Sequence, residues 1–319
     1  KIYNNAQLMG KIDLPTHIST SFRFIASIST FDYYKKDKLF SRNDKPSFNS
    51  KDERFVKLMV ALPFLANKRA EFSLGYGQLE DNYFQSSVID FDKDRSDRST
   101  YKLLGGSIGF YGSTLNTRQY ATKGYLEKLI AQVFTGRERF EPGNPQEGYS
   151  PSPQERQSWL QISYMKEAYH TMGPKFTLGW MAEALYSSKN FSENYTATMM
   201  QAGEFAPTPH SKLMYNEAFR ANQYVAAGIK PIYVLNDMFQ FRTEFYGFTP
   251  IFPIKKNALN KAYYGKAFSR FEYMGEVSVI CHLPFGAISA YVNHYSSPRR
   301  EWNVGMTIGW QLFNYRFVE

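Results

Sequence analysis

The sequence has almost no cysteine and no long apolar segment. Cys281 is the single cysteine among 319 residues, so the chain can form neither an internal disulfide nor a cysteine-rich metal site. The longest apolar run, residues 59–66, contains Pro63 and falls far short of the roughly 20 residues that a membrane-spanning helix requires. These absences exclude a helical membrane protein and a disulfide-stabilised scaffold.

Histidine is also scarce, and the five histidines have no metal-ligand spacing. We therefore expect no metal site and no other cofactor. No nucleic-acid-binding fold or aromatic–basic platform appears in the sequence, so the net charge of +9 does not indicate a nucleic-acid partner. The positive charge fits an anionic lipid surface or solvated loops instead.

Aromatic residues are abundant, and the chain alternates between apolar and polar residues. The 27 Phe, 24 Tyr and 4 Trp exclude a disordered chain, since disordered chains are poor in aromatics. Trp302, Val304 and Met306 alternate with Asn303 and Gly305, a period of two that is typical of strands with two different faces. Such runs predict about twelve strands, each near the length that a tilted membrane strand needs. They lie near residues 19–33, 53–62, 69–85, 100–113, 124–135, 157–169, 175–187, 222–235, 237–248, 266–282, 285–296 and 301–314.

The connections between these strands alternate between short turns and long polar loops. This alternation is typical of an outer-membrane barrel, with short turns on one rim and long loops on the other. A soluble β-sandwich also has alternating strands, but it is seldom so rich in long strands with aromatic ends. We therefore predict an all-β, antiparallel transmembrane β-barrel of about 12 strands, in a range of 12–16, in the bacterial outer membrane. Its turns would be periplasmic and its long loops extracellular.

The predicted organisation places a periplasmic N-terminal lead-in at residues 1–18 and the barrel at residues 19–319. The longest loop covers residues 188–221, and an even strand number would leave both ends in the periplasm. Residues 191–203 are expected to form a short helix within that loop, as a plug element or a lid.

Two segments resemble the bacterial surface-antigen barrels, the superfamily of the outer-membrane assembly factor and the two-partner secretion transporters. Residues 113–124, STLNTRQYATKG, are similar to a periplasmic turn of these barrels. Residues 219–224, FRANQY, resemble the Arg-Gly-Tyr/Phe tip that these barrels carry on a long extracellular loop, and five predicted strands follow them in both cases.

A closer resemblance is to the C-terminal barrel of patatin-like phospholipases from Bacteroides-type bacteria. It rests on residues 207–212 (PTPHSK), 219–224 and 242–248 (RTEFYGF), and it covers most of residues 15–319. The resemblance implies a barrel that anchors, and helps to export, an N-terminal patatin-like lipase domain that is not among these residues. It also implies that lipid acyl hydrolysis belongs to that domain, so no catalytic residue is expected in this chain.

The resemblance further implies that Arg220 packs from the long loop into the barrel lumen and pairs with an acidic group. We expect Glu244 to be that partner, with Arg242 nearby, because a bidentate arginine–carboxylate pair would fix the loop. The remaining expected partners are outer-membrane lipid, lipopolysaccharide and a second copy or larger outer-membrane complex. Lipopolysaccharide contacts are expected from the basic residues of the outer loops. These residues are Lys35, Lys36, Lys38, Lys255, Lys256, Arg299 and Arg300.

Two serine motifs and the barrel itself leave alternatives open. Ser107 lies in a Gly-x-Ser-x-Gly pattern, but that pattern needs a strand–turn–helix context and here falls inside an alternating strand. His294 and Ser296 resemble the Asn-His-x-Ser stretch of outer-membrane phospholipase A, so a phospholipase that uses this pair is one alternative. A polar strand end is the simpler interpretation of the pair. A diffusion pore is the other alternative, although side chains fill a barrel of this size.

Overall fold

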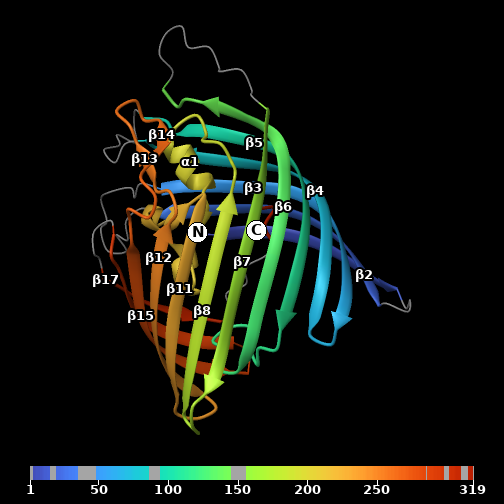
Figure 1. Cartoon of the computed structure of the whole chain (residues 1–319), viewed down its shortest axis with the longest axis vertical. Helices are drawn as coiled ribbons and strands as arrows, with labels where there is room; N and C mark the ends of the chain where they lie inside the picture. The colour runs from blue at the N-terminus through green and yellow to red at the C-terminus, as the bar shows by residue number, and fades with distance from the viewer. Residues whose placement is uncertain are drawn as a thin grey trace.

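Thirteen antiparallel strands form one continuous sheet in the chain order β1 to β17 (Figure 1). The structure is a computed structural model. It describes residues 3–14, 19–34, 48–85, 94–144, 156–284, 286–297, 302–309 and 315–318. The strands of the sheet are β1 (Tyr3–Leu14), β2 (Thr20–Tyr34), β3 (Phe48–Leu65), β4 (Lys68–Tyr83), β5 (Asp97–Ser113), β6 (Gly124–Glu141), β7 (Arg156–Thr171), β8 (Phe176–Ser187), β11 (Gln223–Val234), β12 (Phe239–Pro250), β15 (Glu272–Leu283), β16 (Gly286–Tyr295) and β17 (Trp302–Ile308).

All twelve predicted strands are present, and one further strand was not predicted. The sequence predicts a lead-in at residues 1–18, whereas Tyr3–Leu14 forms β1 and pairs with β2 along its whole length. Ala6 and Gly10 occupy the outward face of β1 and dilute its apolar alternation, which explains why the pattern does not reveal it. With thirteen strands, Tyr3 lies at the rim of the long loops and Ile308 at the rim of the short turns. The prediction that both ends share one rim is therefore wrong.

The two faces of the sheet are inverted relative to a soluble protein. Outward-facing apolar side chains are exposed, including Leu58 at 59%, Leu74 at 58% and Phe245 at 52%. Inward-facing charged side chains are buried, including Glu71 and Lys57. This arrangement excludes the sandwich, whose apolar side chains face the protein interior, and matches a barrel wall with lipid outside.

Small elements fill the connections on the long-loop side. They are α1 (Tyr195–Gln201), β9 (Gly203–Glu204), β10 (Arg220–Ala221), β13 (Ile254–Lys256), β14 (Ala262–Tyr264) and two 3₁₀ turns at Ser211–Leu213 and Glu217–Phe219. The helix α1 confirms the predicted short helix; Asn194 caps it by accepting a hydrogen bond from the Ala197 amide at 2.9 Å. Figure 1 shows α1 beside β13 and β14 at one end of the curved wall.

Aromatic side chains from the long loop and from residues 315–318 pack against the inner face of the wall. Phe205 of the long loop stacks on Phe248 of β12 with ring centroids 5.9 Å apart. Phe317 is only 1% exposed and packs between Phe55 and Phe134. A side chain at Gly77 would meet the Phe317 ring at 3.0 Å, so this glycine leaves the space that the ring occupies.

No helix in the described ranges has the length and the apolar character needed to cross a membrane. Likewise, no register joins β1 to β17 among the residues that the structure describes. Of the basic loop residues named above, Lys255 and Lys256 are exposed on β13. Lys35, Lys36, Lys38, Arg299 and Arg300 lie outside the described residues.

Candidate functional site

The long loop, residues 188–222, folds into the barrel lumen, and Arg220 forms its central internal contacts. The Arg220 side chain is 4% exposed. Its Nη2 atom lies 2.8 Å from a carboxylate oxygen of Glu204, and its Nη1 atom donates to the carbonyl oxygens of Met200 at 3.2 Å and Ala202 at 3.4 Å. Its guanidinium also lies 4.8 Å from the ring centroid of Tyr215. One side chain therefore ties the outgoing and returning halves of the loop together.

The acidic partner of Arg220 differs from the predicted one. Glu204 and Arg220 face each other in the two-residue ladder of β9 and β10. Glu244 lies on the inner face of β12, where Arg242 binds it through Nε at 3.0 Å and Nη2 at 2.9 Å, and Tyr246 donates its hydroxyl to it at 2.7 Å. Arg220 is buried and pairs with a carboxylate, but that carboxylate is Glu204 and not the predicted Glu244, which pairs with Arg242. The short ladder inside the loop has no alternation that the sequence could reveal.

The turn between β5 and β6, residues 114–123, enters the lumen from the other rim. Arg242 donates to the carbonyl oxygen of Ala121 at 3.0 Å, and Gln240 donates to the carbonyl oxygen of Tyr120 at 3.1 Å. Tyr120 has a φ of +56°, a left-handed conformation that non-glycine residues rarely adopt. The segment that resembles a surface-antigen turn is thus bonded to the same inner wall as the long loop.

The tip of the long loop carries a buried serine–histidine–glutamate arrangement. His210 lies 2.7 Å through Nδ1 from Glu276 of β15 and 3.1 Å through Nε2 from the Ser289 hydroxyl of β16. Thr208 donates to the second carboxylate oxygen of Glu276 at 3.0 Å, and the His210 ring stacks on Tyr291 with centroids 3.6 Å apart. The order and the distances are those of a nucleophile, a base and an orienting acid.

Ser289 is enclosed on every side in this conformation. Its side chain is fully buried, the Tyr120 hydroxyl donates to it at 3.0 Å, and Thr307 lies 2.5 Å from it. An ester carbonyl therefore has no approach to the Ser289 hydroxyl, and the cluster joins the loop tip to the inner face of β15 and β16. The sequence did not reveal it because His210 lies 66 and 79 positions from its two partners. The only sequence signal is that Glu276 and Ser289 are polar on inward positions.

The three sequence-predicted serine and histidine candidates are not brought together. Ser296 donates to Glu272 at 2.5 Å and accepts from the Tyr273 amide at 3.0 Å. His294 stacks on Trp302, with ring centroids 4.7 Å apart. Ser107 bonds to Ser73 across the β4–β5 pair at 2.6 Å. Each residue thus has a partner that accounts for it as part of a strand or a strand end.

Comparison with known proteins extends these observations. No family model and no curated protein matches the chain. The solved structure of BamA from Haemophilus ducreyi lacking POTRA domains 1–3 is similar, with a TM-score of 0.58 and 13% identity over 95% of this chain and 60% of that one. The chain has the fold of an outer-membrane β-barrel. It spans about 60% of the BamA chain that it matches.

A second solved structure, the ferric preacinetobactin receptor BauA from Acinetobacter baumannii, has a TM-score of 0.45 and 10% identity over 92% of this chain and 46% of that one. The fold shared with this BamA structure is that of an outer-membrane β-barrel. Together with the exposed apolar outer face, it places this barrel in the bacterial outer membrane.

Lys189, a buried cation of the long loop, has a pKa that its surroundings lower. Lys189 lies 4.6 Å from the Tyr101 ring centroid and 4.9 Å from that of Trp159, and donates to Gln201 at 3.2 Å. Burial lowers the pKa of Lys189 from 10.5 to about 8, against the opposing attraction of Glu138 and then Asp81. Across the described ranges of the barrel, no group of three or more histidine, cysteine or acidic residues is arranged to hold a metal ion.

Proposed function

We propose that this barrel anchors an attached extramembrane domain in the outer membrane, helps to export it, and does not act as an open diffusion pore. The observation that carries the proposal is the filled lumen. The long loop enters from one rim, residues 114–123 enter from the other, and residues 315–318 lie against the inner face of β3 to β6. A wall that is apolar outside and packed inside supports an anchor rather than a water-filled channel.

We further propose that the anchored domain is a lipase of the patatin type. The support is the resemblance of residues 207–212, 219–224 and 242–248 to barrels attached to such lipases. These three segments contain the residues that hold the lumen contents in place: His210, Arg220 and the Arg242–Glu244 pair. Similarity at contacts that fix the loop fits a barrel with the same internal arrangement.

Planar-bilayer recording of the purified, folded barrel tests the anchor proposal. We expect no steady single-channel conductance from the unmodified chain. A variant that lacks residues 189–219 should give steady conductance because the long loop no longer fills the lumen. Steady conductance of the unmodified chain would instead support the diffusion pore.

The Ser289–His210–Glu276 geometry is the one observation that favours a hydrolase within the barrel itself. The same preparation therefore needs a phospholipase assay in detergent with calcium. Three variants separate the candidates: Ser289→Ala, Ser296→Ala and Ser107→Ala. We expect no turnover from any sample, and turnover abolished by one of these changes would make the barrel the enzyme.

A further inference from the structure

The outward face of β3 to β7 carries a row of basic side chains. These residues are far apart in the sequence and become neighbours through the cross-strand register. In the cross-strand register Arg54 of β3 is opposite Gln78 of β4, which is opposite Lys102 of β5. Lys102 is opposite Arg137 of β6, which is opposite Arg156 of β7. All four cations are exposed. We refer to Arg54, Lys102, Arg137 and Arg156 as the basic row.

The basic row follows the edge of the apolar outer face on the long-loop side. On β3 and β5 the next outward residues toward the other rim are Val56 and Leu104, which are 46% and 49% exposed. On β6 the outward residue Thr135 separates Arg137 from Val133, and on β7 Ser158 separates Arg156 from Leu160. Because the long loops are extracellular in such barrels, this edge lies at the headgroups of the outer leaflet.

Three members of the basic row are directly opposed like charges. Side chains opposite each other on neighbouring strands lie roughly 5 Å apart, and like charges in such pairs are destabilising. The outward carboxylates near the row have other partners: Glu80 pairs with Arg98 at 3.3 Å and Glu141 with Arg139 at 2.8 Å. Asp52, next to Arg54 on the outward face of β3, accepts a hydrogen bond from the Thr30 hydroxyl at 2.5 Å. Within the described ranges, no carboxylate forms an ion pair with Lys102 or Arg137. The row therefore has a charge that an external anion would neutralise.

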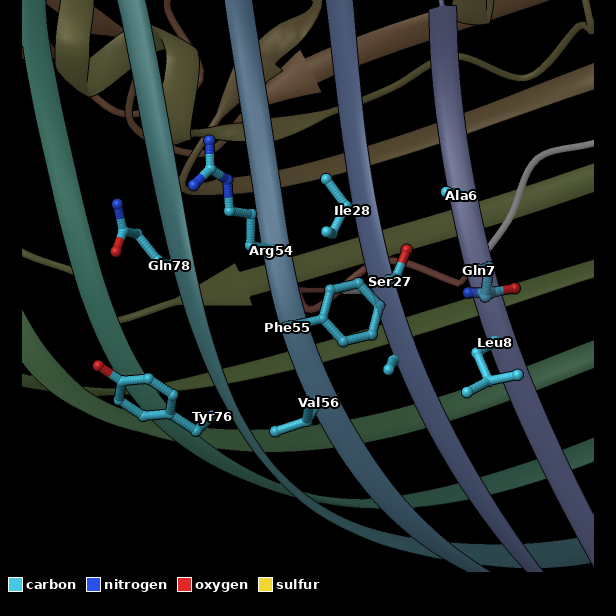
Figure 2. Close-up of a pocket in the computed structure, with 11 residues that line it drawn as sticks. Ala6, Gln7, Leu8, Ser27, Ile28, Arg54, Phe55, Val56, Tyr76 and Gln78 are labelled. Atoms are coloured by element: carbon cyan, nitrogen blue, oxygen red, sulfur yellow. The ribbon is translucent and has the colours of Figure 1, made fainter.

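An outward groove of about 640 Å³ lies beside the Arg54 end of the row. Its lining includes the small side chains of Ala6 and Ala26 beside the larger apolar ones of Leu8, Ile28 and Val56. Figure 2 shows Arg54 and Gln78 on neighbouring strands, with Val56 and Tyr76 one step further along the same strands. The groove thus leads from a cation into the apolar band, as a site for a headgroup with an attached acyl chain requires.

We infer that the basic row binds the phosphate groups of an outer-leaflet glycolipid and that the groove holds one of its acyl chains. Arginine forks bind phosphate oxygens in bidentate fashion. Four strand-to-strand steps separate Arg54 from Arg156, which is about 19 Å. A headgroup that carries two phosphate monoesters, as lipid A does, matches cations spread over this distance better than a single free anion.

Binding of diphosphorylated lipid A to the folded protein in detergent tests the inference, with fluorescence or native mass spectrometry as the readout. A cation at a membrane surface contributes about fivefold in affinity. The triple variant Lys102→Gln, Arg137→Gln, Arg156→Gln should therefore bind roughly a hundredfold more weakly. Lys166→Gln is the control, because Lys166 is an outward cation of β7 that pairs with Glu127 at 3.5 Å toward the other rim. It should leave the affinity unchanged.

The lipid arms distinguish the sources of phosphate. The unmodified protein should bind a glycolipid without phosphates at least tenfold more weakly than it binds diphosphorylated lipid A. The triple variant should bind these two lipids with equal affinity. Unchanged affinity of the triple variant, or an equal loss in Lys166→Gln, would overturn the inference. Displacement of lipid A by an equal concentration of inorganic phosphate would assign the row to free phosphate and overturn the lipid site. Heat modifiability on gels checks that each variant is folded. The melting temperature of the triple variant should be no lower than that of the unmodified protein, because the repulsion between like charges has been removed.

Discussion

At the scale of single residues, buried charges fix the contents of the lumen. Arg220, Arg242 and Lys230 each lie within 3 Å of a carboxylate, and each is at most 5% exposed. Removing one member of such a pair leaves an uncompensated buried charge, which costs roughly 3–5 kcal/mol. These residues are therefore the sensitive positions of the molecule.

We predict that Arg220→Ala releases the long loop. The Glu204 carboxylate and the carbonyl oxygens of Met200 and Ala202 then lose their shared donor. A loss of about 3 kcal/mol in the free energy that keeps the loop docked lowers protection against proteolysis between residues 188 and 217 by at least a hundredfold. Limited proteolysis of the folded barrel in detergent measures this protection. Unchanged protection would contradict the role of Arg220.

A double-mutant cycle checks the identity of the partner. Arg220→Ala combined with Glu204→Gln should give a strongly non-additive loss of protection, since the two side chains share one ion pair. Glu244→Gln should combine additively with Arg220→Ala, because Arg242 binds that carboxylate. Stronger coupling with Glu244 than with Glu204 would restore the partner expected from the sequence.

We predict that docking of the long loop depends on pH through Lys189. Its pKa is lowered to about 8 in the docked loop and lies near 10.5 when the loop is free, so the free loop binds more protons between these values. Protection of the docked loop should therefore rise as the pH increases from 8 to 10, by up to about 3 kcal/mol. Proteolysis or hydrogen exchange across this range measures the slope.

Lys189→Met should abolish the pH slope by removing the titrating group. Lys261→Met is the matched control, because the Lys261 side chain is 50% exposed and pairs with Glu193. A slope that persists in Lys189→Met would show that another group controls the docking.

At the scale of elements, the strands were predictable from sequence because their two faces meet different surroundings. Even the run 53–62, with Lys57 among apolar neighbours, is part of β3, since Lys57 faces the lumen and donates to the Arg316 carbonyl at 3.3 Å. Contacts inside the lumen were less accessible to prediction. Arg220 was found through its loop motif, whereas Glu204 lies in a ladder of two residues and His210 finds its partners on strands far along the chain.

Residues 315–318 pack against the inner face of the barrel wall. Phe317 should make the largest contribution of these residues to the stability of the barrel. We predict that Phe317→Ala destabilises the barrel by about 3–5 kcal/mol, because a cavity opens among Phe55, Phe134 and Gly77. The readout is the temperature at which the folded, heat-modifiable form converts to the unfolded one. Phe271→Ala is the control, since Phe271 is 65% exposed. Equal temperatures for the two variants would exclude Phe317 as a stabilising contact.

At the scale of the whole molecule, the barrel combines a lipid-facing exterior with an interior assembled from separate parts of the chain. The alternation of apolar outward and polar inward residues predicts the fold class from the sequence. The filled interior distinguishes this barrel from an open channel. The basic row belongs to the same scale, because it emerges only when five strands are aligned in register.

The turn at residues 114–123 and the tip of the long loop enter from opposite rims and meet inside the barrel. The Tyr120 hydroxyl lies 3.4 Å from His210 Nε2, and both side chains bond to Ser289. A displacement of the loop tip would therefore reach residues 114–123 through two hydrogen bonds at Ser289.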